Sequence, residues 1–276
     1  MKSILLTGGS GGFGQAFTER LLKENVARIC IYSRGEHAQA DMARRLKDHR
    51  ERLRFFIGDI RDRLRLTRAA DGCDVIVHAA ALKRIEVGFY NPVEMVKTNV
   101  MGAVNVIEAA RDAGVGKVVA LSTDKAYEPI SPYGHSKALA EALFLAANTG
   151  ERAPRFALVR YGNVWCAPGS VVPTWKQMLE DGEEVLPVTD PDATRFFMWM
   201  HEAVDLVLDT IKTMKGGETA IPVLPAYRIG DLAEAMRAKT VTIGLPHYEK
   251  LHEKMNEFSC SKDARRMTIE ELRAAL

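Results

Sequence analysis

Residues 3–14 read Ser-Ile-Leu-Leu-Thr-Gly-Gly-Ser-Gly-Gly-Phe-Gly, and this stretch decides the fold. Its apolar first half, residues 3–7, is typical of a buried parallel strand. Glycines then recur at every third position, and a helical pattern begins within the loop. Such a turn lets the backbone approach a pyrophosphate, which the N–H groups of the helix start can bind. We therefore predict a dinucleotide-binding loop. Its expected cofactor contacts are Gly8, Ser10, Gly11, Phe13 and Gly14.

Apolar runs and helical patterns alternate along the chain as far as residue 161. The expected strands are 3–7, 28–32, 53–57, 75–78, 117–121 and 156–161, and the expected helices are 12–23, 37–47, 63–70, 93–113 and 133–147. This alternation predicts an α/β fold with a doubly wound parallel sheet of the Rossmann type. In such sheets ligands bind beyond the carboxyl ends of the strands.

The pattern changes at residue 163, where proline becomes frequent. Helices are expected over 172–181, 201–212, 229–237 and 269–275. We expect residues 1–162 to form a cofactor-binding domain and residues 163–276 to form a small substrate-binding lobe. These helices are too little for a core of their own, so we expect the lobe to fold over the sheet edge as one wall of a cleft.

The composition of the 276 residues excludes several classes of protein. With 47% hydrophobic and 27% charged residues the chain is typical of a globular protein, and a net charge of +2 favours neither nucleic acid nor an anionic membrane as partner. The four cysteines are scattered, and neither they nor the histidines stand at metal-ligand spacing, so no metal is expected. No leader or long apolar span is visible, and we expect a cytoplasmic protein.

A second motif begins at Ser122-Thr-Asp-Lys125 and continues with Tyr133 and Lys137. The Tyr-x-x-x-Lys spacing places both side chains on one face of a helix. The lysine can lower the pKa of the phenol and hydrogen-bond a ribose, and the tyrosine can move an alcohol proton while nicotinamide takes a hydride. An exposed helix that carries both residues by chance is the alternative.

The residues at the end of the second strand indicate which nicotinamide cofactor the protein binds. Ser33 and Arg34 stand where NAD-binding proteins often have a carboxylate, and a hydroxyl with a guanidinium suits a 2′-phosphate, which favours NADP over NAD. Residues after the third and fourth strands complete the expected cofactor contacts, which are Asp59, Ile60, Ala79, Ala80 and Ala81.

These two motifs together resemble the extended short-chain dehydrogenase/reductase superfamily. Further stretches resemble one of its subgroups, the soluble inverting UDP-N-acetylglucosamine 4,6-dehydratases of the pseudaminic acid pathway. They are Tyr32-Ser-Arg34, Phe56-Ile-Gly-Asp59, His78-Ala-Ala-Ala-Leu-Lys83, Ser122-Thr-Asp-Lys-Ala126, Arg160-Tyr-Gly-Asn-Val164, Gly169-Ser-Val-Val-Pro173, Thr194-Arg-Phe196 and Glu249-Lys-Leu-His-Glu253.

The resemblance implies an NADP-dependent lyase that oxidises a nucleotide sugar at C4, removes water across C5 and C6 and returns the hydride to C6. Tyr133 would act as base with support from Lys137, Lys125 would remove the C5 proton, and Asp124 would protonate the departing C6 hydroxyl. It also implies a homo-oligomer. The expected substrate contacts are Lys83, Thr123, Asn163, Val171, Arg195 and Glu253.

Three positions depart from the pattern of this subgroup. Pro168 and Pro246 replace arginines expected to hold the substrate diphosphate, and Trp165 replaces a small residue beside the sugar. Less sequence than usual follows residue 256. These departures suggest a substrate altered from UDP-N-acetylglucosamine. Two other functions stay open: an epimerase or plain oxidoreductase that uses Tyr133 and Lys137, and a non-catalytic regulator that senses NADP.

Overall fold

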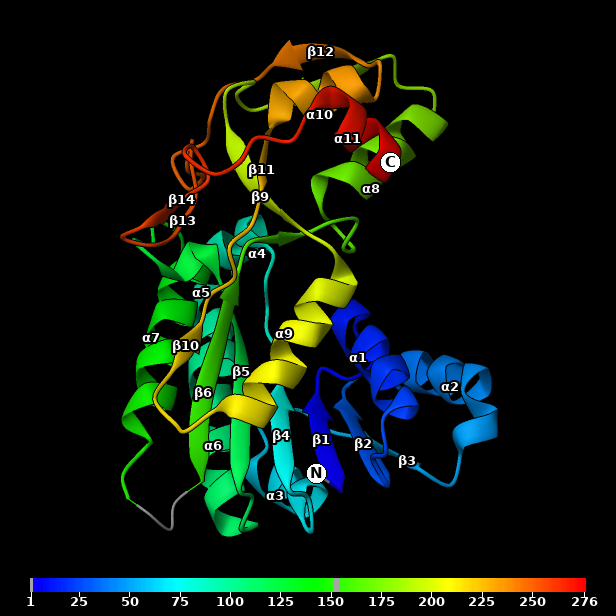
Figure 1. Cartoon of the computed structure of the whole chain (residues 1–276), viewed down its shortest axis with the longest axis vertical. Coiled ribbons are helices and arrows are strands. Elements are labelled where there is room, and N and C mark those ends of the chain that lie inside the picture. The colour runs from blue at the N-terminus through cyan, green and yellow to red at the C-terminus, as the bar shows by residue number, and fades with distance from the viewer. Residues whose placement is uncertain (1, 151–153) are drawn as a thin grey trace.

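The centre of the molecule is a sheet of seven parallel strands, seen in a computed structural model that describes residues 2–150 and 154–276 (Figure 1). The strand order is β10-β6-β5-β4-β1-β2-β3. The strands are β1 (Ser3–Thr7), β2 (Arg28–Ser33), β3 (Leu53–Ile57), β4 (Val75–His78), β5 (Lys117–Thr123), β6 (Arg155–Tyr161) and β10 (Thr219–Ala220). Because β1 pairs with both β2 and β4, the direction of winding reverses beside β1. The doubly wound parallel sheet expected from the sequence is confirmed.

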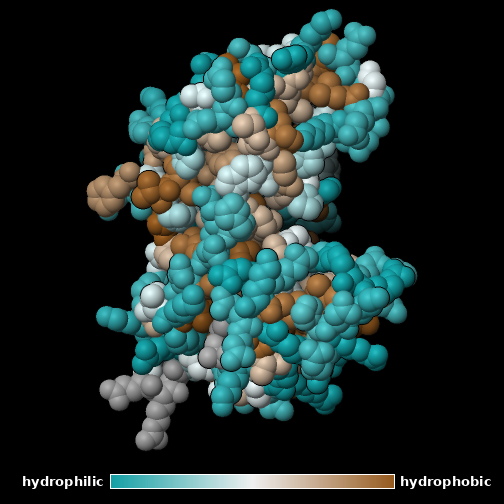
Figure 2. Space-filling view, turned by 45° about the vertical axis from the view of Figure 1, so that its right-hand side comes forward, coloured by the Kyte–Doolittle hydropathy of each residue, from teal (hydrophilic) through white to brown (hydrophobic). Residues whose placement is uncertain are grey.

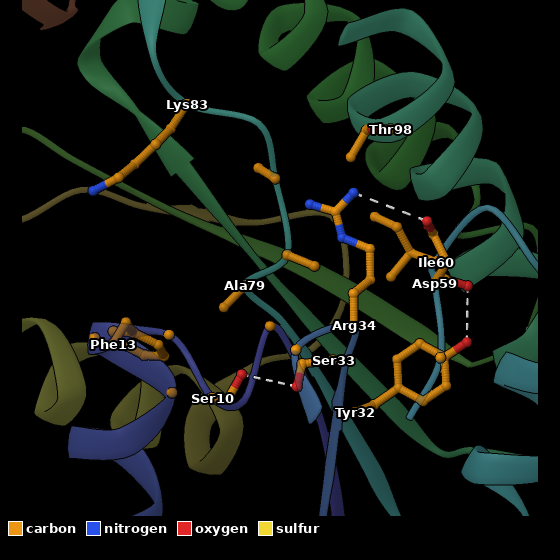
Figure 3. A pocket seen from close by; sticks show the side chains of 18 residues that line it. Ser10, Phe13, Tyr32, Ser33, Arg34, Asp59, Ile60, Ala79, Lys83 and Thr98 are labelled. Carbon is orange, nitrogen blue, oxygen red and sulfur yellow. Dashed lines mark hydrogen bonds and ion pairs between the residues drawn. The ribbon is translucent and has the colours of Figure 1, made fainter. Parts of the chain in front are cut away.

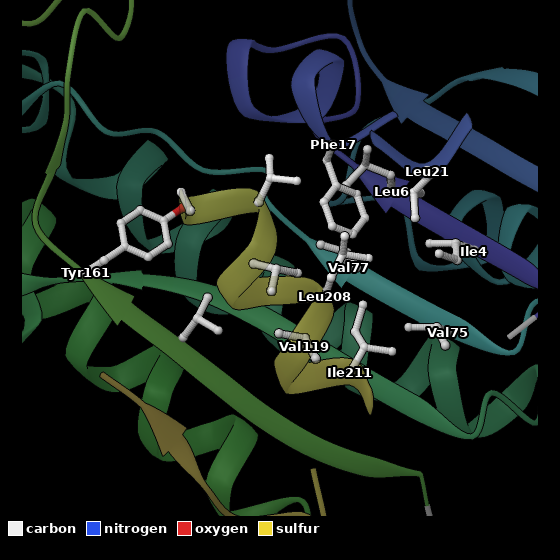
Figure 4. Close-up of a cluster of buried hydrophobic side chains, with 14 of the residues drawn as sticks. Ile4, Leu6, Phe17, Leu21, Val75, Val77, Val119, Tyr161, Leu208 and Ile211 are labelled. Atoms are coloured by element: carbon white, nitrogen blue, oxygen red, sulfur yellow. The ribbon is translucent and has the colours of Figure 1, made fainter. Parts of the chain in front are cut away.

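Helices cover both faces of this sheet (Figure 1). One face carries α1 (Gly12–Lys23), α2 (Glu36–Arg45) and α9 (Met200–Thr213), and the other carries α3 (Arg63–Ala70), α6 (Gly102–Asp112) and α7 (Pro132–Ala146). Successive strand residues point to opposite faces. Ile4 and Leu6 therefore pack with Phe17 of α1 and Ile211 of α9, as Figure 4 shows, whereas Leu5 belongs to the core on the other face. Burial of each such side chain contributes about 1.5–3 kcal/mol.

The helix expected over 93–113 is present, but it is not α-helical throughout. After a separate short helix, α4 (Ile85–Tyr90), the chain runs without a break from α5 (Pro92–Met95) through a π-helical segment, η2 (Val96–Met101), into α6. Pro92 has no N–H to donate and therefore starts a helix rather than continuing one. Within η2 the side-chain amide of Asn99 donates to the carbonyl of Leu82 at 2.9 Å and accepts from its N–H at 2.8 Å. This tertiary contact, which apolar periodicity does not reveal, ties the segment to the loop after β4.

The other expected elements of the first part differ only at their ends. The helix expected from residue 37 starts at Glu36 and is followed by a 3-10 turn, η1 (Lys47–His49). Strand β5 continues through Thr123, two residues beyond its expected end, and leads into another 3-10 turn, η3 (Asp124–Ala126). That extension carries the second motif to the edge of the sheet.

The upper part of the molecule in Figure 1 is a lobe with small sheets of its own. Its strands are β7 (Asn163–Val164), β8 (Val185–Val188), β9 (Thr194–Met198), β11 (Ala226–Arg228), β12 (Lys239–Thr242), β13 (Lys254–Asn256) and β14 (Ser259–Cys260). Its helices are α8 (Val171–Glu180), α10 (Ile229–Ala235) and α11 (Ile269–Ala275). The expectation that this lobe has no core is wrong, because Trp165, Trp175, Phe197 and Leu232 belong to a third buried apolar cluster.

Two elements after residue 163 return from the lobe to the main sheet. Helix α9 packs against α1, and β10 extends the sheet by pairing with β6. The expected domain boundary between residues 162 and 163 stays a prediction. Any such division has to assign residues 200–220 to the part that holds the sheet.

The surface is mostly hydrophilic on the face shown in Figure 2, where apolar side chains are interspersed and several gather around the middle of the molecule. Over residues 2–150 and 154–276, no helix combines the length and the apolar character that a bilayer span requires. The same residues bring no group of three His, Cys, Asp or Glu side chains together in an arrangement that could bind a metal.

Candidate functional site

The glycine-rich loop forms one wall of a cavity at the carboxyl ends of β1, β2 and β4. Gly8 has a φ of +68°, and a Cβ atom there would lie 2.9 Å from the backbone nitrogen of Ala80. Only glycine allows this left-handed backbone and close approach together. The following helix α1 has no side-chain cap at Gly11, so its first N–H groups face the loop without a side-chain acceptor. This is the geometry that binds phosphate.

The cavity in front of the loop has a volume of about 570 Å³ (Figure 3). Small-molecule sites usually measure about 300–1,000 Å³. All twelve cofactor contacts expected between residues 8 and 81 line it: Gly8, Ser10, Gly11, Phe13, Gly14, Ser33, Arg34, Asp59, Ile60, Ala79, Ala80 and Ala81. The sequence did not single out Gly12, Tyr32, Gly35, Gly58 and Thr98, which also line it. Lys83, expected at the sugar, lies here too.

One end of the cavity carries a hydroxyl and a guanidinium. The Ser33 hydroxyl accepts hydrogen bonds from Ser10 and from the Gln39 amide, each at 2.8 Å. Arg34 extends along the cavity in Figure 3, its side chain 59% exposed, and its ion-pair partner Asp59 lies 4.0 Å away. The pKa of Asp59 is lowered, since Arg61 and Arg34 outweigh its partial burial. An anion beside Ser33 and Arg34 would therefore find a donor and a positive charge.

The second group of polar residues lies where β5 ends. Asp124 is completely buried, and its Oδ1 atom accepts from the Thr123 hydroxyl at 2.9 Å and from the Lys125 ammonium at 3.1 Å. Its Oδ2 atom has no hydrogen-bond partner among the described residues. A Cβ atom at Gly162 would lie 3.2 Å from Oδ2, so a side chain there would crowd the carboxyl group.

Lys125 lies among three oxygen acceptors. Its Nζ atom is 3.1 Å from Asp124 Oδ1, 3.3 Å from Asn163 Oδ1 and 3.3 Å from Glu253 Oε1. Burial alone would lower the pKa of Lys125, but the charges of Asp124 and Glu253 outweigh burial and raise it above its usual value. Burial raises the pKa of Asp124. The pair thus combines an ammonium with a carboxyl group that holds its proton more tightly than usual.

Helix α7 presents the tyrosine and the lysine. Its first turn is fixed by the Ser131 hydroxyl, which accepts from the N–H of Gly134 at 3.1 Å. Burial raises the pKa of Tyr133 to about 12, although Lys125 acts in the opposite direction. Burial lowers the pKa of Lys137 to about 8, and its ammonium donates to the carbonyl of Leu121 at 2.7 Å. The expectation that Lys137 lowers the pKa of the phenol is not met, because burial raises this pKa and the cation that opposes burial is Lys125.

The lobe adds residues from distant parts of the chain. Glu253 is 2% exposed and faces Lys125, and Lys250, which sequence analysis missed, lies 3.8 Å from Glu253 Oε2. Arg195 of β9 pairs with Glu249 and donates to the carbonyls of Thr194 and Leu251. Both of its terminal nitrogens thus have protein acceptors. A phosphate contact of Arg195 stays a prediction, and only three of the five N–H donors of its guanidinium are used by these acceptors.

The remaining expected substrate contacts, Lys83 and Val171, lie in the cofactor cavity and on α8. Val171 is the first residue of α8, and Lys83 donates to the carbonyl of Pro168 at 3.1 Å. Trp165 is 6% exposed, and its indole packs on Phe197 and Tyr227 and donates to the carbonyl of Ala275 at 2.9 Å. This tryptophan belongs to the lobe core, and its effect on a bound sugar stays a prediction.

Known proteins resemble the chain over nearly its whole length. The family described as polysaccharide biosynthesis protein matches residues 4–271. A Campylobacter jejuni protein named UDP-N-acetylglucosamine 4,6-dehydratase (inverting) is 44% identical over 92% of this chain and 77% of its own. A Rickettsia akari protein named UDP-glucose 4-epimerase is 39% identical over the same shares.

A solved structure shows the same fold. The X-ray structure of Pen from Bacillus thuringiensis superimposes with a TM-score of 0.94, covers 99% of this chain and 95% of its own and is 31% identical. The resemblance to dehydratases and epimerases of the short-chain dehydrogenase/reductase superfamily is confirmed. The chain belongs to the polysaccharide biosynthesis protein family.

Proposed function

We propose that this protein is an NADP-dependent nucleotide-sugar 4,6-dehydratase that inverts C5 of the sugar. The observation that carries the proposal is the fully buried carboxyl group of Asp124 beside the Lys125 ammonium. Both groups are close enough to Tyr133 of α7 to influence the pKa of its phenol. An elimination needs an acid for the leaving hydroxyl and a base for the proton on the neighbouring carbon. The name of the Campylobacter relative supports this activity.

The residues around the cavity fit a dinucleotide with a 2′-phosphate. The glycine loop and the start of α1, which has no side-chain cap, offer backbone N–H groups to a pyrophosphate. Two donors occupy the acceptor sites of the Ser33 hydroxyl, so its own proton is available to an anion. Arg34 adds a guanidinium, which pairs well with phosphate. These contacts favour NADP, with NAD as the alternative.

The roles of the side chains follow from their surroundings. A bound nicotinamide would supply hydride acceptance from C4 and hydride return to C6. Tyr133 takes the proton of the C4 hydroxyl, and Lys137 holds the ribose. The ketone at C4 acidifies the C5 proton. Lys125, whose side chain is 20% exposed, gives its own proton to solvent and then takes the C5 proton as a neutral amine. Asp124 gives a proton to the C6 hydroxyl, so water departs as the C5–C6 double bond forms. When the hydride returns to C6, a proton joins C5 from the other face, which inverts that centre.

A second candidate is an epimerase, because the Rickettsia relatives at 38–39% identity carry that name. An epimerase needs Tyr133 and Lys137 but no acid for a leaving hydroxyl. The buried Asp124–Lys125 pair favours dehydration for this reason. Labelled substrate separates the two: deuterium at C4 migrates to C6 in a dehydratase and returns to C4 in an epimerase.

The substrate is proposed only as a nucleotide-linked sugar, altered from UDP-N-acetylglucosamine. Pro168 and Pro246 provide no guanidinium for a diphosphate, and the ammonium of Lys83 lies 3.1 Å from the Pro168 carbonyl. A panel of nucleotide sugars should be incubated with protein and NADP and screened by mass spectrometry for loss of water. Loss from one sugar with C4-to-C6 label migration is the expected result, and no loss from any sugar would contradict the proposal.

Two further expectations stay proposals: a cytoplasmic location, and a homo-oligomer, which the resemblance implies. Sedimentation at several concentrations checks the second. The non-catalytic alternative has its own test in the host, since Tyr133→Phe and Lys125→Ala would leave the biological effect of an NADP sensor unchanged.

A further inference from the structure

Two buried carboxyl groups share the ammonium of Lys125. Asp124 Oδ1 lies 3.1 Å from Nζ and Glu253 Oε1 lies 3.3 Å from it, while Asn163 supplies the third acceptor at 3.3 Å. Asp124 and Glu253 are 0% and 2% exposed. Two carboxylates that share one cation away from water repel each other, so one of them tends to keep a proton.

The surrounding cations decide which carboxyl group is ionised. Lys250 lies 3.8 Å from Glu253 Oε2, and the Arg195 guanidinium adds positive charge on the same side. These cations and Lys125 outweigh burial and lower the pKa of Glu253. Asp124 has Lys125 as its single ion-pair partner among the described residues. The environment is therefore asymmetric, as in enzymes where two carboxyl groups take two roles.

The other groups near Asp124 do not reverse this asymmetry. The phenols of Tyr133 and Tyr227, whose pKa values burial raises to about 12, stay neutral at ordinary pH. Thr123 donates a hydrogen bond to the Oδ1 atom. Asp124 Oδ2 and Glu253 Oε2 both have no hydrogen-bond partner among the described residues, but Glu253 Oε2 has the Lys250 ammonium 3.8 Å away. An Oδ2 atom of this kind is where an acidic proton can reside and be given to a ligand.

We propose that Glu253 is a positioning residue: it acts as the main counter-ion of Lys125 and thereby lets Asp124 keep the proton that the departing C6 hydroxyl needs. This role deepens the proposed dehydration and rests on it. In the step concerned, the O–H bond of Asp124 breaks and its proton joins the C6 oxygen. The C6–O bond breaks with release of water, and Asp124 becomes a carboxylate that regains a proton before the next turnover.

The state of Asp124 can be measured without any substrate. Protein labelled with ¹³C at aspartate carboxyl groups should show one signal, absent from Asp124→Asn, that titrates well above the usual range of aspartate. In Glu253→Gln, which keeps the size of the side chain, this signal should titrate at lower pH. An unshifted titration in Glu253→Gln overturns the proposal, and Glu253→Asp should restore most of the wild-type value.

A kinetic measurement then tests the consequence. Glu253→Gln should lose water from the sugar about 10–100-fold more slowly than wild type at neutral pH, a modest share of what general acids contribute. The rate should recover as the pH falls, and hydride removal from C4 should change little. If the rate of water loss in Glu253→Gln falls by the same factor at all pH values, the proposal is overturned. Glu128→Gln, which changes an exposed carboxylate paired with Lys254, is the matched control.

The two proposals fail in different ways. If the wild-type protein loses no water from any nucleotide sugar, the dehydratase function is wrong, whatever the carboxyl titration shows. If wild type loses water and Glu253→Gln behaves like wild type in both measurements, only the role of Glu253 is wrong.

Discussion

The carboxyl group of Asp124 lies 3.1 Å from the ammonium of Lys125, its neighbour in the chain. Adjacent residues in a strand point in opposite directions. Here the strand ends at Thr123, and the 3-10 turn η3 brings the two side chains together. The turn buries the carboxyl group completely and leaves the lysine side chain 20% exposed. An acid and a potential base thus meet at the sheet edge where ligands of such folds bind.

Asp124→Asn tests the acid directly. Asparagine keeps the shape of the side chain but has no proton to give a hydroxyl group, so loss of water should fall about 10²–10⁴-fold. Hydride removal from C4, measured by absorbance of the reduced cofactor in a single turnover, should be nearly unchanged. Asp192→Asn, at a carboxylate that is 70% exposed, serves as control. If the rates of hydride removal and of water loss fall by the same factor, Asp124 is not the acid for the leaving hydroxyl.

Arg34→Ala tests the choice of cofactor. A hydrogen bond to a charged group contributes about 1.5–3 kcal/mol, so NADP should bind about 10–150-fold more weakly. NAD affinity should stay within about twofold, because NAD has no 2′-phosphate for Arg34 to contact. Calorimetry with both cofactors measures the two effects. Arg44→Ala, at a 79% exposed position of α2, is the control, and equal weakening of both cofactors would argue against the proposal.

The cavity was predictable because its sequence signals are local. A strand, a glycine-rich turn and a helix follow one another within residues 3–23. The close contact between Gly8 and Ala80 is possible only because glycine has no Cβ atom. The alternation of strands and helices then places residues such as Ser33 and Asp59 at the same edge. That Thr98 lines the cavity was not predicted, because it lies on the π-helical segment η2, whose winding has no apolar period.

The contacts between the lobe and the sheet were not predictable in the same way. Glu253 was expected as a substrate contact, which stays a prediction; its ion pair with Lys125 and the nearby Lys250 were not expected. These residues meet through tertiary packing, for which neither periodicity nor spacing gives a signal. Trp165 shows the same limit, since its sequence position suggested the sugar site and its side chain fills the lobe core.

Lys137→Met should stabilise the folded protein at neutral pH. Burial lowers the pKa of Lys137 from 10.5 to about 8, so the folded state holds this proton less tightly than the unfolded state. Below pH 8 the charged amine destabilises the fold by up to about 3 kcal/mol, at about 1.4 kcal/mol for each pKa unit. As the pH rises from about 8 to 10.5, the unfolded chain holds more protons, and this destabilisation disappears.

Urea unfolding of wild type and Lys137→Met at pH 7 and pH 10 measures this difference. Lys137→Met should increase the free energy of unfolding more at pH 7 than at pH 10. The loss of the hydrogen bond to the Leu121 carbonyl should make the increase smaller at both pH values. Lys97→Met, at a 55% exposed position, should show little effect at either pH. A gain of equal size at both pH values would show that the charge of Lys137 is not its cause.

Trp165 should hold the C-terminal helix α11 on the lobe. Its indole donates to the carbonyl of Ala275 at 2.9 Å and packs between Phe197 and Tyr227. Trp165→Phe removes the hydrogen bond and should cost about 1 kcal/mol of stability, whereas Trp165→Ala also leaves a cavity and should cost about 3–5 kcal/mol. Chemical denaturation measures both, and limited proteolysis should cut residues 269–275 faster in Trp165→Ala. Phe258→Ala, at an 88% exposed side chain, is the control. Unchanged protection of α11 in Trp165→Ala would mean that other lobe contacts hold the helix, and Trp165 would then contribute to the apolar core alone.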